Sequence, residues 1–86
     1  MSDILIKNYP HLDIHGETEA TADLIIKEFI NDHIKMRNKI IVIIHGKGMG
    51  ILKRKVHQIL AKDYRIASFK LENNNLGSTI IELKID

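Results

Sequence analysis

Five β-branched residues in succession, from Ile40 to Ile44, constrain the fold of this chain more than any other feature. The run has the length of a strand, lies between Asn38 and Gly46, and is far too short for the roughly 20 residues that a membrane span needs. Because it does not alternate with polar residues, we predict a strand that is buried on both faces or nearly so. The chain has 86 residues, enough for one core, so this strand should be central in a single domain.

The segment before this run predicts a strand and a long helix. Leu12 to His15 alternates apolar and polar residues as a half-buried strand does, and Gly16 ends it. From Thr18 to Met36 the apolar residues recur at helical spacing, and Thr18 is the expected N-cap.

The segment after the run predicts a second helix and two more strands. Glycines within residues 46–50 make a tight connection into a helix whose basic side chains should largely face away from the core: Lys53, Arg54, Lys55 and His57. Arg65 to Leu71 reads as a third strand. The alternation from Thr79 to Ile85 predicts a fourth strand, after a turn at Asn73 to Asn75.

This βαβαββ order predicts a two-layer α/β sandwich with a four-stranded mixed sheet. Two consecutive strand-helix-strand units imply parallel pairing with right-handed crossovers, which places both helices on one face of the sheet. The short connection before the last strand predicts that it runs antiparallel to the others. The second face of the sheet should therefore stay open.

Composition excludes several classes of function. The chain has no cysteine, which rules out disulfides, thiolate metal sites and thiol catalysis. It shows no signal-peptide pattern, so we expect a cytoplasmic protein with no membrane partner. The net charge is only +2 and the pI is about 9.0. However, Lys47, Lys53, Arg54 and Lys55 fall in one short stretch, which is either the footprint of a polyanion or simply a solvated helix face.

Two His-Gly pairs, His15-Gly16 and His45-Gly46, fall at the carboxyl ends of the first two predicted strands. Open α/β sheets bind ligands at this edge. Strand alternation also places His11, Asp13 and His15 on one face. They could be a solvated surface with Asp13 paired to a cation, a metal cluster, or groups for acid-base chemistry or ligand orientation.

Residues 45–50, His-Gly-Lys-Gly-Met-Gly, resemble a phosphate cradle at a helix N-terminus, with Lys47 supplying charge. The alternative is that the glycines serve only a tight strand-to-helix turn. The spacing matches neither the Rossmann nor the P-loop pattern. Phe29 and Phe69 look like core residues, so we expect no aromatic platform for unpaired bases and contacts mainly to a nucleic-acid backbone.

Three segments together resemble the small MutS-related (Smr) domain family. Residues 12–16 read Leu-Asp-Ile-His-Gly, where the family typically has Leu-Asp-Leu-His-Gly, and residues 45–48 fit its His-Gly-x-Gly motif. Asn74 to Thr79 occupies the place of the third family motif, commonly Gly-Gly-x-Gly-Ala-Thr, and Gly77 and Thr79 match it. The resemblance extends from about Leu12 to Lys84, which predicts an extension at 1–11 and an Smr-like domain at 12–86.

The resemblance implies a fold similar to the C-terminal domain of translation initiation factor three. It also implies binding of DNA or RNA and, as in many relatives, endonuclease activity. Family members are often parts of MutS-like repair proteins, RNA-binding proteins or ribosome-associated proteins. The alternative is a non-catalytic module that binds nucleic acid, or one that docks on a ribosome or repair complex.

The predicted mechanism is phosphodiester cleavage, with one of His15 and His45 as general base and the other as acid, and with Asp13 orienting an imidazole or holding a metal. A 2′-hydroxyl nucleophile in RNA would need no metal, whereas DNA cleavage by water makes a divalent cation such as magnesium at Asp13 attractive. The predicted contacts to nucleic acid or phosphate are Gly46, Lys47, Gly48, Gly50, Lys53, Arg54, Gly77 and Thr79.

Overall fold

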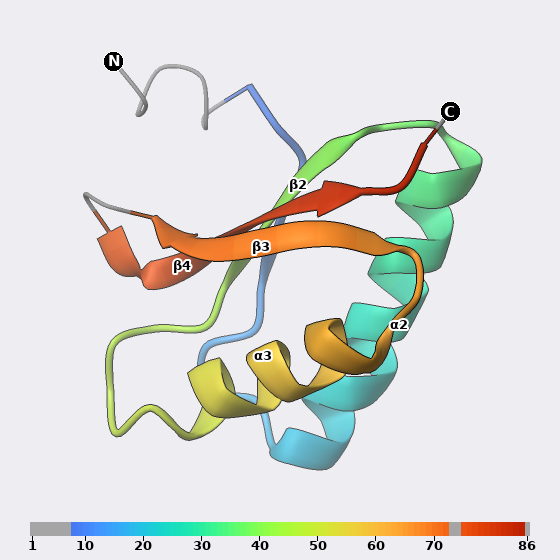
Figure 1. The fold of residues 1–86 in the computed structure, drawn as a ribbon. Coiled ribbons are helices and arrows are strands. Elements are labelled where there is room, and N and C mark those ends of the chain that lie inside the picture. The colour runs from blue at the N-terminus through green and yellow to red at the C-terminus, as the bar shows by residue number, and fades with distance from the viewer. Residues whose placement is uncertain (1–7, 73–74, 86) are drawn as a thin grey trace.

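The computed structural model describes residues 8–72 and 75–85, which form two helices and one four-stranded sheet (Figure 1). In chain order the elements are β1 (His11–Asp13), α2 (Glu19–Lys35), β2 (Ile40–Ile44), α3 (Ile51–Lys62), β3 (Ile66–Glu72) and β4 (Asn75–Leu83). This is the predicted βαβαββ order. Of the predicted turn, Asn73 and Asn74 lie outside the described residues, and Asn75 already begins β4, earlier than the predicted start at Thr79.

The strands are arranged in the order β1-β2-β4-β3. β1 and β2 are parallel, and β4 runs antiparallel to both of its neighbours, which confirms the mixed sheet and the antiparallel last strand. The predicted direct pairing of the second and third strands is wrong, because β4 lies between them. The central position suits β4, whose Thr79, Ile81 and Leu83 are fully buried, while β3 exposes Ser68 and Lys70 and tolerates an edge.

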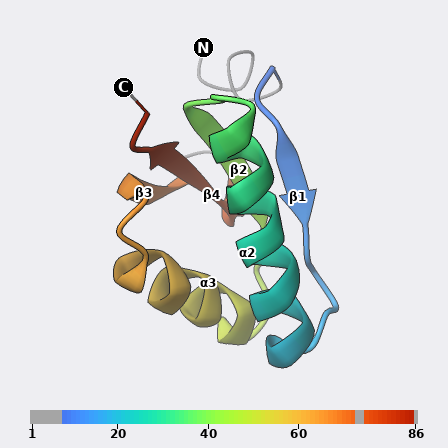
Figure 2. The same ribbon diagram turned by 90° about the vertical axis from the view of Figure 1, so that its right-hand side faces the viewer.

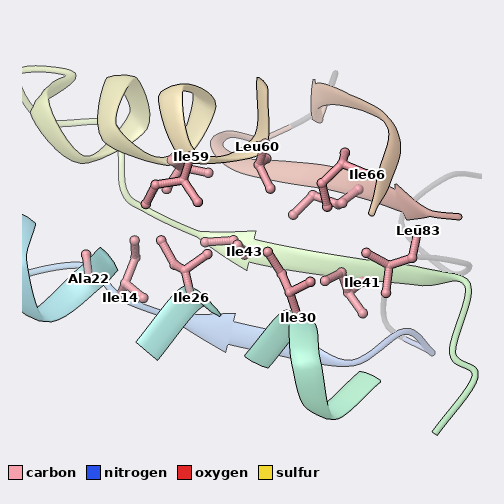
Figure 3. Close-up of a cluster of buried hydrophobic side chains, with 12 residues drawn as sticks. Ile14, Ala22, Ile26, Ile30, Ile41, Ile43, Ile59, Leu60, Ile66 and Leu83 are labelled. Atoms are coloured by element: carbon pink, nitrogen blue, oxygen red, sulfur yellow. The ribbon is translucent and has the colours of Figure 1, made fainter. Parts of the chain in front are cut away.

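Both helices pack on the same side of the sheet, as predicted (Figures 1 and 2). The core between the layers is built mainly from isoleucine, contributed by both helices and by the helix-facing side of the sheet (Figure 3). Burying one such side chain contributes about 1.5–3 kcal/mol. The fully buried members from the central strands and α2 include Ile26, Ile30, Ile41, Ile43 and Ile81.

The two helices begin in different ways. Thr18 caps α2, because its side-chain oxygen accepts a hydrogen bond from the Thr21 amide at 3.1 Å, as predicted. α3 follows Gly50, which has a φ of +80° and no side chain that could cap the helix. The first amides of α3 therefore remain available to a ligand. Within residues 8–72 and 75–85, no helix is long and apolar enough to cross a membrane.

Candidate functional site

The two His-Gly pairs lie side by side at one edge of the sheet. The Ile14 amide donates to the Ile44 carbonyl oxygen at 2.8 Å, which extends the β1–β2 pairing to the end of both strands. A Cβ placed on Gly46 would lie 3.5 Å from Cβ of His15. Gly16 and Gly46 have φ values of +84° and +86°, a backbone conformation that favours glycine at both turns. The predicted meeting of the two motifs is thus present in the structure.

Asp13 and His15 form an exposed ion pair at this edge. Nδ1 of His15 lies 2.5 Å from Oδ1 of Asp13, and the His15 amide donates to the same oxygen at 3.1 Å. The side chains remain 71% and 49% exposed for His15 and Asp13. Their hydrogen bond raises the pKa of His15 and lowers the pKa of Asp13. Because Nδ1 faces the carboxylate, Nε2 is the ring atom left for a substrate.

His45, by contrast, is buried, with 4% of its surface exposed. Its Nδ1 lies 3.0 Å from the Gly46 carbonyl oxygen, and its Nε2 lies 2.8 Å from Oγ1 of Thr79. Thr79 is fully buried, and its hydroxyl also lies 2.9 Å from Nε2 of His57, on α3. The three side chains therefore form a hydrogen-bonded chain that ties the end of β2 to β4 and α3. We call it the His45–Thr79–His57 chain.

The hydrogen-bond partners determine which atoms donate and which accept in the His45–Thr79–His57 chain. A carbonyl oxygen only accepts, so Nδ1 of His45 carries the proton, and in the neutral ring Nε2 accepts from the Thr79 hydroxyl. The Thr79 oxygen in turn accepts from Nε2–H of His57. Burial lowers the pKa of His57, and the nearby His45 and Lys53 lower it further. The lowered pKa favours the neutral form of His57, and its Nε2–H tautomer donates to Thr79.

A glycine-lined hollow lies beside the His45–Thr79–His57 chain, between the β2–α3 loop and the β3–β4 hairpin. Its volume is about 340 Å³, and its basic members are the exposed Lys47 and the half-buried Lys53. Gly46, Gly48, Met49, Gly50, Leu71 and Leu76 complete the lining. An anion in this hollow would meet two ammonium groups and the start of α3.

The remaining predicted residues are placed as follows. The Gly77 carbonyl oxygen accepts hydrogen bonds from the amides of both His45 and Gly46, at 2.8 and 2.9 Å. Gly77 therefore fixes the start of the β2–α3 loop to β4. Arg54 is exposed on α3, whereas Nζ of Lys55 lies 3.9 Å from a carboxylate oxygen of Asp23 on α2. Thr79 is enclosed by the two imidazoles and does not reach the surface.

The prediction that His57 lies on the outer side of its helix is wrong. The ring points inward, to Thr79 and to Phe69, whose ring centroid is 5.1 Å away. The available signal was weak: His57 directly follows the buried Val56 and precedes Leu60 by one helical turn, so it flanks the apolar stripe of α3.

No group of three or more histidine, cysteine or acidic side chains that could hold a metal ion is found in the part of the chain that the structure describes. The His11, Asp13 and His15 cluster considered from the sequence is therefore not formed. Asp13 and His15 alone are fewer ligands than a protein-only site requires.

The fold and this edge define a class of protein: a two-layer α/β domain whose two His-Gly turns meet beside a basic, glycine-lined hollow. A family model described as the Smr domain matches residues 12–84. The chain belongs to this family, which confirms the resemblance seen in the motifs.

Similar proteins with curated names are MutS2 proteins. "Endonuclease MutS2" of Halothermothrix orenii is 38% identical over 78 residues, which cover 87% of this chain and 10% of that protein. The protein of the same name from Thermotoga maritima is 38% identical over 77 residues, with 86% and 10% covered. The chain thus spans about a tenth of the length of these relatives.

Solved structures show the same fold. The crystal structure of the Smr domain of Thermus thermophilus MutS2 matches with a TM-score of 0.84 and 26% identity, over 87% of this chain and 98% of that one. YdaL, a stand-alone small MutS-related protein from Escherichia coli, matches with a TM-score of 0.83 and 18% identity, over 88% and 67%. The second likeness concerns the fold alone.

Proposed function

We propose that this domain binds DNA or RNA at the edge formed by the ends of β1 and β2 and cleaves a phosphodiester bond there. The observation that carries the proposal is the exposed Asp13–His15 pair beside Gly46 and the basic hollow. An oriented imidazole next to an anion-binding loop is the combination that phosphoryl chemistry uses. The endonuclease names of the relatives support the same class of reaction.

In the proposed reaction Nε2 of His15 takes a proton from the attacking hydroxyl group, and Asp13 stabilises the imidazolium that forms. The hydroxyl oxygen bonds to phosphorus, the bond from phosphorus to the leaving oxygen breaks, and that oxygen takes a proton from solvent water. The nucleophile is the neighbouring 2′-hydroxyl group in RNA or a water molecule with DNA. Lys47 and the amides of the glycine loop stabilise the added charge on the phosphate.

His45 fits a supporting role better than direct proton transfer. Both of its ring nitrogens are engaged, with the Gly46 carbonyl oxygen and the Thr79 hydroxyl. In the proposal His45, Gly77 and Thr79 hold the loop, and Lys47 and Lys53 contact the phosphate. With DNA as substrate, Asp13 is the residue that would hold a magnesium ion, which would supply charge stabilisation to the phosphate, because this ion often binds through one carboxylate and phosphates.

A second candidate is a non-catalytic module that binds nucleic acid, as part of a repair or ribosome-associated assembly. The burial of His45 favours it. A mechanism that uses two histidines needs two accessible imidazoles, and among the described residues only that of His15 is exposed at this edge. The two candidates predict the same binding and differ only in turnover.

The test is a cleavage assay on labelled single-stranded RNA, duplex RNA and supercoiled DNA, each with magnesium and with chelator. The Asp13→Ala, His15→Ala double variant is compared with His11→Ala, which removes an exposed histidine from the start of β1. Cleavage that is lost only in the double variant supports the nuclease. Salt-sensitive binding without cleavage in any arm rejects it and leaves the binding module.

Lys47→Gln should weaken binding of duplex nucleic acid and flatten its salt dependence. Each lost phosphate contact reduces the slope of log K against log salt by about 0.9 for duplex DNA. Lys35→Gln, at the far end of α2, is the matched control and should leave the slope unchanged. Fluorescence anisotropy at several salt concentrations measures both. An unchanged slope for Lys47→Gln would remove this lysine from the interface.

A further inference from the structure

The two helices differ sharply in charge. α3 carries Lys53, Arg54, Lys55 and Lys62 and no acidic residue. α2 carries four acidic residues and two lysines: Glu19, Asp23, Glu28, Asp32, Lys27 and Lys35. A polyanion that leaves the glycine loop is therefore attracted along α3 and repelled by α2.

One stripe of α3 faces solvent along the length of the helix. Arg54, Gln58 and Lys62 follow one another at intervals of four residues, so they lie on one side, and all three are exposed. The helix has 12 residues, and at 1.5 Å per residue it is about 18 Å long. The length of the whole helix, from the glycine loop to Lys62, matches roughly five stacked nucleotides at about 3.4 Å each.

The stripe ends at an exposed aromatic ring. Tyr64, two residues beyond the helix, is 83% exposed. It lines a groove of about 500 Å³ together with Gln58 and Lys62 of the stripe, and with Lys55 and Lys27. Phe29 and Phe69 pack against the core, as predicted. The exposed ring of Tyr64, by contrast, is an aromatic surface that was not predicted.

The acidic residues of this groove are already paired with cations. Asp63 accepts hydrogen bonds from Nε and Nη2 of Arg65 at 3.0 and 2.8 Å, which lowers its pKa. Asp23 lies 3.0 Å from Nζ of Lys27 and 3.9 Å from Nζ of Lys55. The repulsion of a phosphate by these two carboxylates is thereby reduced.

We infer that a single-stranded segment of the nucleic acid follows the Arg54–Gln58–Lys62 stripe of α3 and stacks one unpaired base on Tyr64. Phosphates contact Arg54 and Lys62, and the ring of Tyr64 takes a base of any identity, because every base offers a flat π-face. This inference rests on the proposed binding of nucleic acid. It adds that the preferred substrate has unpaired nucleotides beyond the glycine loop.

Anisotropy titrations with labelled oligonucleotides test the inference. The probes are single strands of about 4 and about 12 nucleotides, as RNA and as DNA, and a blunt duplex of the longer sequence. Tyr64→Ala should weaken binding of the longer strand about tenfold, or about 1.4 kcal/mol. Tyr64→Phe keeps the ring and should stay within about twofold of the unmodified protein. The short strand and the duplex should be unaffected by either change.

The possible results separate this inference from the proposed function. Equal binding of the longer strand by Tyr64→Ala and the unmodified protein overturns the stacking contact, and so does an equal loss with the blunt duplex. If Lys47→Gln still weakens binding in that case, the proposed function is supported and only the path along α3 is rejected. If the unmodified protein binds none of the probes, the proposed function and the path along α3 are both rejected. Circular dichroism of Tyr64→Ala confirms that the variant is folded.

Discussion

Replacing His15 with glutamine should reduce the rate of nucleic-acid cleavage by roughly 10²- to 10⁴-fold, the usual contribution of a positioned general base. The side chain is 71% exposed and its hydrogen bond is to Asp13, so the fold does not depend on it. His11→Gln is the matched control, because His11 is an exposed histidine of β1, the strand that leads into the His15-Gly16 turn. A His15→Gln variant that cleaves at the full rate would exclude His15 as the base.

The same pair predicts a pH dependence. A general base must be neutral, and Asp13 raises the pKa of His15 by stabilising the imidazolium, so cleavage should increase with pH through a value above the ordinary 6.5. Asp13→Asn removes the negative charge, so the rising part of the profile should move to lower pH while the maximal rate falls. Rate-pH profiles of both proteins measure the shift. A profile that does not move would contradict the coupling of these residues.

Thr79→Val should lower the free energy of unfolding by about 1–3 kcal/mol. Valine has almost the same shape, but it leaves Nε2 of His45 without its hydrogen-bond partner in a buried position. The connection after β2, which contains Gly46, should loosen with it. Urea denaturation of the two proteins gives the difference.

A double-mutant cycle with His57→Phe isolates the contribution of the hydrogen-bonded chain. Because His57 and Thr79 are in direct contact, the effects of the two substitutions should deviate from additivity by about 0.5 kcal/mol or more. Strict additivity would show that the two side chains do not act as a unit, and the loss in Thr79→Val would then be due to His45 alone.

The local sequence was sufficient to predict those elements whose structure depends on neighbouring residues. The β-branched run at Ile40 to Ile44 forms β2, and Thr18 caps α2, because both depend on side-chain shape and on contacts within a few residues. The ends of β1, β3 and β4 were shifted by one to four residues, since the extent of a strand depends on its partner strand.

The candidate site divides in the same way. The sequence alone determined that two His-Gly turns would meet at one edge, because the carboxyl ends of parallel neighbouring strands are adjacent, and it placed Asp13 and His15 together. Only the tertiary structure decided that β4 separates β2 from β3, and in this central position Ile81 and Leu83 are fully buried. It also decided that Thr79, on β4, joins His45, which directly follows β2, to His57 on α3. Such contacts are set by packing between elements, and no local pattern encodes them.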